Sequence, residues 1–126
     1  MIHLMIVEDN DIVRKSLIKF LDREKGIKVH AEASNGKVAL EQLAKGAEVD
    51  VVMIDWNMPD MDGLELTQLI KTQFANIKVI ILTMHGKQEY MVQSKNAGAA
   101  AYLLKDMEIE DIGNVIRAVS SGATFL

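Results

Sequence analysis

Four short, unbroken apolar runs dominate the hydrophobic pattern of the chain. They lie at residues 4–7, 51–54, 79–82 and 100–104. Uninterrupted runs of this length are typical of strands in a parallel sheet that is covered on both faces. Residues 28–34 instead alternate small apolar residues with polar ones. Such alternation indicates a half-exposed edge strand, so the pattern predicts five strands.

Helical patterns separate these strands. In four segments apolar residues recur every three or four positions, as they do on one face of a helix. These residues are Val13, Leu17, Phe20 and Leu21; Ala39, Leu40 and Leu43; Leu66, Leu69, Ile70 and Phe74; and Ile109, Ile112, Val115, Ile116 and Val119. Expected helix ends lie close to Gly26, Gly46, Asn76 and Gly98.

A fifth helix is expected over residues 87–96, where the apolar stripe is thin. It consists of Tyr90, Met91 and Ala97. Elements with few buried apolar contacts have low local stability, so this helix should be the most mobile one. An ordinary exposed helix is the simpler alternative.

Strand and helix thus alternate five times along the chain. Alternation of this kind gives right-handed βαβ crossovers and an α/β fold with a doubly wound parallel sheet. The most economical arrangement is the flavodoxin-like (βα)5 fold with strand order 2-1-3-4-5. The length of 126 residues suits one domain, which we assign to residues 1–126.

Composition and charge exclude several classes of protein. The chain has no cysteine, so disulfides and thiolate metal sites are excluded and a cytoplasmic location is the default expectation. The net charge is −4, and no basic stripe suited to nucleic acid phosphates is present. We find neither an export signal nor an apolar run long enough to span a membrane.

Polar residues gather where the predicted strands end. Glu8 and Asp9 follow the first strand and Asp55 the third, while Thr83 and Lys105 follow the fourth and fifth. Each has an ordinary interpretation, such as capping a helix or meeting solvent. Because ligands bind at the carboxyl ends of parallel strands, the residues also form a candidate site when taken together.

Three carboxylates at one sheet edge require compensation, because two of them about 4 Å apart repel by roughly 4 kcal/mol at an effective dielectric constant of 20. Ligands with oxygen donors only and open positions for water and phosphate favour Mg²⁺. Asp55 is then a candidate nucleophile toward phosphorus. Thr83 and Lys105 would stabilise the transferred phosphoryl group.

These five positions, together with the loop IDWNMPDMDG at residues 54–63, resemble the receiver domain of two-component response regulators over essentially the whole chain. The resemblance implies that a histidine kinase phosphorylates Asp55 in a Mg²⁺-dependent reaction. It also implies that Glu8, Asp9, Asp55 and the backbone carbonyl of Asn57 hold the metal. Thr83 and Tyr102 would act as the switch that changes the surface of the fourth helix, fifth strand and fifth helix.

The end of the chain, residues 112–126, is similar to the last helix of LuxR/NarL-type regulators, in which a DNA-binding domain follows. We therefore expect contact with DNA through an attached domain, and a homodimer formed on phosphorylation is a further expected partner. A stand-alone CheY-like regulator acting through protein contacts is the alternative. A haloacid dehalogenase-like phosphatase is disfavoured, because Asn57 stands where those enzymes have a proton-donating aspartate. A degenerate receiver is disfavoured because every site residue is present.

Overall fold

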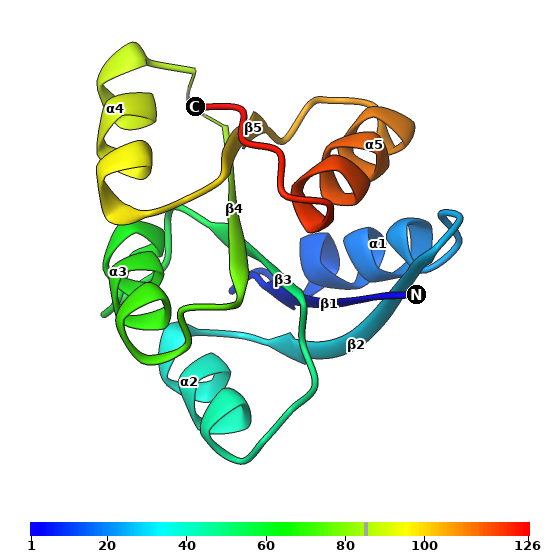
Figure 1. The fold of residues 1–126 in the computed structure, drawn as a ribbon, viewed down its shortest axis with the longest axis horizontal. Helices are drawn as coiled ribbons and strands as arrows, with labels where there is room; N and C mark the ends of the chain where they lie inside the picture. The colour runs from blue at the N-terminus through cyan, green and yellow to red at the C-terminus, as the bar shows by residue number, and fades with distance from the viewer. Residues whose placement is uncertain (85) are drawn as a thin grey trace.

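The computed structural model describes residues 1–84 and 86–126, which form a five-stranded parallel sheet with helices on both faces (Figure 1). The strand order is β2-β1-β3-β4-β5, as predicted. The strands are β1 (Ile2–Val7), β2 (Ile27–Ala33), β3 (Val51–Asp55), β4 (Lys78–Thr83) and β5 (Ala101–Leu104). The predicted flavodoxin-like α/β fold is therefore confirmed.

Five helices alternate with the strands. They are α1 (Asp11–Leu21), α2 (Gly36–Ala44), α3 (Gly63–Gln73), α4 (Gln88–Ala97) and α5 (Ile109–Ser120). Helices α1 and α5 cover one face of the sheet, and α2, α3 and α4 cover the other (Figure 1). Among the described residues, no helix has the length and apolar content needed to cross a bilayer.

The core consists of two layers, one on each face of the sheet. In β1, Leu4 and Ile6 belong to the layer under α1 and α5, whereas Met5 and Val7 belong to the opposite layer. All four side chains are buried. Successive residues of a strand point to opposite faces, so a strand covered on both sides needs an unbroken apolar run. The edge strand β2 alternates exposed positions with buried or half-buried ones, as its sequence predicted.

The apolar face of α1 differs from the predicted one. Phe20 remains 45% exposed, and its ring lies 5.7 Å from Lys19 Nζ. Leu21 and Arg14 are the buried residues of this helix. The burial of Arg14 was not predicted, because an arginine in a helix is expected to face solvent unless its partners are known.

Helix α4 is the least apolar of the five helices, in agreement with its thin stripe. Its buried residues are Ser94 and Ala97, while Met91 is 38% exposed and so lies outside the buried face. The helix ends at Gly98, whose φ of 103° is the left-handed conformation that glycine adopts without strain. Its greater mobility stays a prediction.

Candidate functional site

Three carboxylates converge at the carboxyl edge of the sheet. Glu8 and Asp9 follow β1, and Asp55 ends the adjacent strand β3. Val7 pairs with Ile54 in the sheet register, so the residues that follow them lie side by side. One carboxylate oxygen from each acid lies within 4.8 Å of the other two. Glu8 and Asp55 are only 2% and 5% exposed, whereas Asp9 is exposed to solvent. The cluster predicted from the sequence is therefore present.

Lys105 supplies a positive charge to this cluster. Its Nζ lies 2.7 Å from Glu8 Oε1 and 2.9 Å from Asp55 Oδ1. Burial by itself lowers the pKa of Lys105, but the hydrogen bonds to Glu8 and Asp55 outweigh it, so the pKa is raised above the usual lysine value. The lysine is therefore charged at neutral pH. One cation among three acids leaves an excess of negative charge that suits a divalent metal ion.

The acids do not cap α1. Asn10 does this, because its Oδ1 accepts the Val13 N–H at 3.0 Å. The backbone of Glu8 is held instead by Arg14, whose Nη1 donates to the Glu8 carbonyl at 2.9 Å. The hydrogen bond from Arg14 to Glu32 raises the pKa of the guanidinium. Arg14 thus supports the position of Glu8.

Arg14 is a supporting residue that the sequence reasoning missed. The available signal was its spacing, because Arg14 stands three and seven positions before two apolar residues of the same helix, Leu17 and Leu21. Its partners Asp11 and Glu32, at 2.7 and 2.9 Å, come from two different elements. This pairing across α1 and β2 could not be recognised before the fold was known.

The loop after Asp55 is closed by backbone contacts. The Trp56 N–H donates to the Leu82 carbonyl at 3.2 Å, and the Gly63 N–H donates to the Trp56 carbonyl at 2.9 Å. A Cβ at Gly63 would lie 2.6 Å from the Asp55 carbonyl oxygen, so glycine is required for this close approach. The Asn57 N–H points to Asp55 Oδ1 at 3.4 Å.

Asp60 and Asp62 shape the turn into α3. Asp60 has a φ of 70°, in the left-handed region that aspartate tolerates better than most residues. Asp62 is the N-cap of α3, because its Oδ1 accepts the Glu65 N–H at 2.9 Å. Both acids therefore have a structural role apart from the cluster of Glu8, Asp9 and Asp55, here called the acid cluster.

Thr83 and Tyr102 lie on the strands that border the site. Thr83 ends β4 and is 1% exposed, while Tyr102 lies in β5 and is 9% exposed. Burial raises the pKa of the Tyr102 phenol, which is therefore neutral at physiological pH. The Trp56 ring meets the Tyr102 ring edge-on, with centroids 6.3 Å apart. Asn57 lies in the loop beside them and is exposed.

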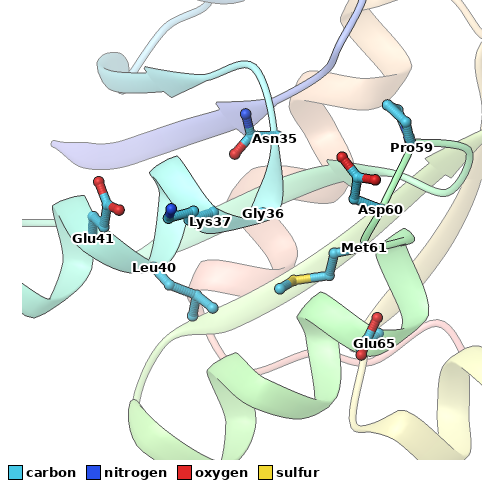
Figure 2. Close-up of a pocket in the computed structure, with 9 residues that line it drawn as sticks. All are labelled: Asn35, Gly36, Lys37, Leu40, Glu41, Pro59, Asp60, Met61 and Glu65. Carbon is cyan, nitrogen blue, oxygen red and sulfur yellow. The ribbon is translucent and has the colours of Figure 1, made fainter.

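A cavity lies beside the loop that follows Asp55, outside the acid cluster. It has a volume of about 480 Å³ and lies between α2 and the segment 59–65. Figure 2 shows Leu40 of α2 and Met61 of the loop pointing toward one another across it. The side chains at the acid cluster do not line this cavity. It is therefore separate from the candidate site.

Comparison with known proteins identifies the class to which this fold and site belong. The family described as "Response regulator receiver domain" matches residues 4–117, so the chain belongs to that family. The protein described as "Response regulator UvrY" of Escherichia coli K12 is 38% identical over 126 residues, which are 100% of this chain and 57% of that protein. "Transcriptional regulatory protein LiaR" of Bacillus subtilis is 35% identical over 122 residues, 97% of this chain and 57% of that protein.

Among solved structures, a LuxR-family two-component response regulator from Aurantimonas sp. SI85-9A1 superposes with a TM-score of 0.92 at 27% identity, covering 98% of this chain and 88% of the other. The homologues are LuxR/NarL-family regulators. The chain spans 57% of the length of the first curated relatives that it matches. A receiver is a phosphoacceptor of a two-component system rather than a conventional enzyme, and the acid cluster is typical of a receiver Mg²⁺ site.

Proposed function

We propose that this receiver accepts a phosphoryl group on Asp55 from the phosphohistidine of a histidine kinase and thereby controls transcription through an attached DNA-binding domain. The main support is the environment of Asp55. Its carboxylate is buried, pairs with Lys105 at 2.9 Å and belongs to a cluster with two further acids. An aspartate that only caps a helix or shapes a turn, as Asp62 and Asp60 do, needs neither a paired lysine nor two neighbouring acids.

In the proposed reaction, a carboxylate oxygen of Asp55 attacks phosphorus and the phosphorus–nitrogen bond of the phosphohistidine breaks. The electron pair of that bond returns to the imidazole nitrogen, and an acyl phosphate forms on Asp55. Lys105 donates to an oxygen of the transferred group, which reduces the charge that develops in the transition state. Thr83 ends the adjacent strand β4, and in this proposal its hydroxyl donates to another phosphoryl oxygen.

Glu8, Asp9 and Asp55, with the backbone carbonyl of Asn57, would hold Mg²⁺ in this proposal. The fit rests on the donors, because three carboxylates without histidine or cysteine form a hard oxygen site. The bound ion supplies positive charge next to the incoming phosphoryl group. Since Lys105 already pairs with buried Glu8 at 2.7 Å, exposed Asp9 is the acid best placed to bind the ion directly.

Phosphorylation then changes the surface formed by α4, β5 and α5. The phosphoryl oxygens draw the Thr83 hydroxyl inward, and Tyr102 turns into the space that this movement leaves. Converting a 1:99 population to 99:1 takes about 5.5 kcal/mol of differential stabilisation. One hydrogen bond contributes roughly 1 kcal/mol, so Lys105, the metal and loop amides must contribute as well.

The output is proposed from the relatives, since UvrY and LiaR are named as regulators and this chain covers 57% of their length. The attached domain would contact DNA, while the receiver contacts its kinase and a second receiver in the cytoplasm. A stand-alone CheY-like regulator is the second candidate, supported by the structural match to a CheY-like receiver from Methanospirillum hungatei with a TM-score of 0.85 at 26% identity. Finding the reading frame beyond Leu126 in the source genome distinguishes the two.

The phosphoacceptor function is tested by incubating the chain with a small acyl phosphate or phosphoramidate donor. We expect Mg²⁺-dependent incorporation of one phosphoryl group, which chelation of the metal abolishes. Asp55→Asn should be inert, whereas the control Asp60→Asn, an exposed acid of the same loop, should be labelled. A chain that binds Mg²⁺ but never takes up the label would instead be a degenerate receiver.

A further inference from the structure

Trp56 directly follows Asp55 and is the only tryptophan in the sequence. Its backbone is tied on both sides, because its N–H donates to Leu82 of β4 and its carbonyl accepts from Gly63. The close approach of Gly63 to the Trp56 Cα, where a Cβ would lie 2.9 Å away, limits movement further. The backbone that carries the indole ring is therefore held in one position within the phosphoacceptor loop.

The half-buried ring of Trp56 contacts aromatic residues of two other elements. Its centroid lies 4.9 Å from that of Tyr90 in α4, at an interplanar angle of 51°. It lies 6.3 Å from that of Tyr102 in β5, at 83°. Tilted and edge-to-face geometries at these separations are favourable for aromatic pairs. One side chain thus bridges the phosphoacceptor loop, α4 and β5.

Helix α4 is attached unevenly along its length. Its buried residues, Ser94 and Ala97, are both in the C-terminal half, where the Ala99 N–H also donates to the Ser94 carbonyl. At the N-terminal end, the N-cap residue Lys87 makes no side-chain capping bond, and Met91 is 38% exposed. Tyr90 is the residue of the N-terminal half that packs with the core layer containing Trp56. The tilted ring contact with Trp56 therefore links this end of α4 to the phosphoacceptor loop.

We propose that Trp56 is a positioning residue that transmits the state of the phosphoacceptor loop to the N-terminal half of α4 through Tyr90. This inference rests on the proposed phosphorylation of Asp55 and adds a route for its effect. When Tyr102 changes its position, its edge contact with the Trp56 ring changes, and the rings of Trp56 and Tyr90 shift together. The end of α4 nearest the site then changes its position and exposure.

The test compares hydrogen exchange of Gln88–Ala97 with and without beryllofluoride, an acyl phosphate mimic, in the presence of Mg²⁺. Losing an aromatic pair should raise exchange at this end of α4 roughly 2- to 12-fold. We expect Trp56→Leu and Tyr90→Leu to show this increase and to lose the response to the mimic. Trp56→Phe should restore the response, and the control Met91→Ala should retain it.

Binding of the mimic is measured separately by fluorine-19 NMR, which does not depend on the tryptophan. If the unmutated chain shows no bound fluoride signal, the proposed phosphoacceptor function fails. The route through Trp56 is refuted if the mimic binds but α4 of Trp56→Leu and Tyr90→Leu responds as strongly as α4 of the unmutated chain. It is also refuted if the mimic binds to the unmutated chain and its α4 does not respond. A double-mutant cycle on unfolding should show coupling between Trp56 and Tyr90, and additive losses would also contradict it.

Discussion

Replacing Lys105 with methionine probes the electrostatic balance of the acid cluster. The substitution leaves Glu8 and Asp55 buried without their shared cation. At the separation of 4.8 Å that bounds the cluster, two carboxylates repel by about 3.5 kcal/mol at an effective dielectric constant of 20. A proton that neutralises one carboxylate relieves this repulsion. Protonating an ordinary glutamate at pH 7 costs about 3.7 kcal/mol. Because the acids take whichever of the two costs less, the expected loss of unfolding free energy at pH 7 is about 3.5 kcal/mol.

The pH dependence of this loss has a definite sign. The raised pKa of Lys105 means that its stabilising contribution is complete below the ordinary lysine pKa and is lost only as the pH rises through the higher folded value. Between pH 5 and 7 the lysine contribution is therefore constant. In the variant, the repelling acids bind a proton more readily when folded than when unfolded, so its stability falls as the pH rises. At pH 5 protonation costs only about 1 kcal/mol, and the loss should shrink to that value.

Urea unfolding of both proteins at pH 5 and pH 7 without Mg²⁺ measures these values. Lys95→Met is the matched control, because Lys95 is exposed on α4, and it should stay within about 0.5 kcal/mol of the unmutated chain. Adding Mg²⁺ should recover part of the loss in Lys105→Met. A loss below 1 kcal/mol at pH 7, or one that is equal at the two pH values, would refute the electrostatic reasoning.

Three further predictions concern the neighbouring residues. Asp9→Asn should weaken Mg²⁺ binding in calorimetry more than Glu8→Gln does, because Glu8 is already engaged by Lys105, and equal affinities would contradict this. Gly63→Ala should cost about 1 to 3 kcal/mol in urea unfolding, because its Cβ would lie 2.6 Å from a backbone oxygen of β3; an unchanged midpoint would be the opposing result. Asp62→Ala should remove the α3 cap at a cost of about 1 kcal/mol without changing Mg²⁺ affinity, which calorimetry on the same sample checks.

The fold could be predicted from the sequence because its signals are local and repeated. An unbroken run such as residues 51–54 indicates burial on both faces, and alternation in residues 28–34 indicates an edge. These patterns determine the number of strands, and the rules for crossovers then leave few topologies. No proline follows Lys105, so the sequence predicts a trans peptide to Asp106, and this peptide is trans.

The site was predictable in part for a similar reason. Parallel strands bring their carboxyl ends to one edge, so Glu8, Asp9, Asp55 and Lys105 had to lie near one another. The capping of α1 by Asn10 was missed, because Glu8, Asp9 and Asn10 are consecutive polar residues that periodicity does not distinguish. Contacts such as that of Trp56 with Tyr90 depend on side-chain packing between distant segments, which no local pattern encodes.

Mapping the phosphorylated residue tests the central claim most directly. Borohydride reduces an aspartyl phosphate to homoserine, so peptide mass spectrometry after phosphorylation and reduction identifies the acceptor. We expect homoserine at position 55 only, formed in the presence of Mg²⁺ and absent after chelation. Homoserine at position 9, 60 or 62 with Asp55 unmodified, or label that survives on Asp55→Asn, would contradict the assignment of Asp55 as the phosphoacceptor.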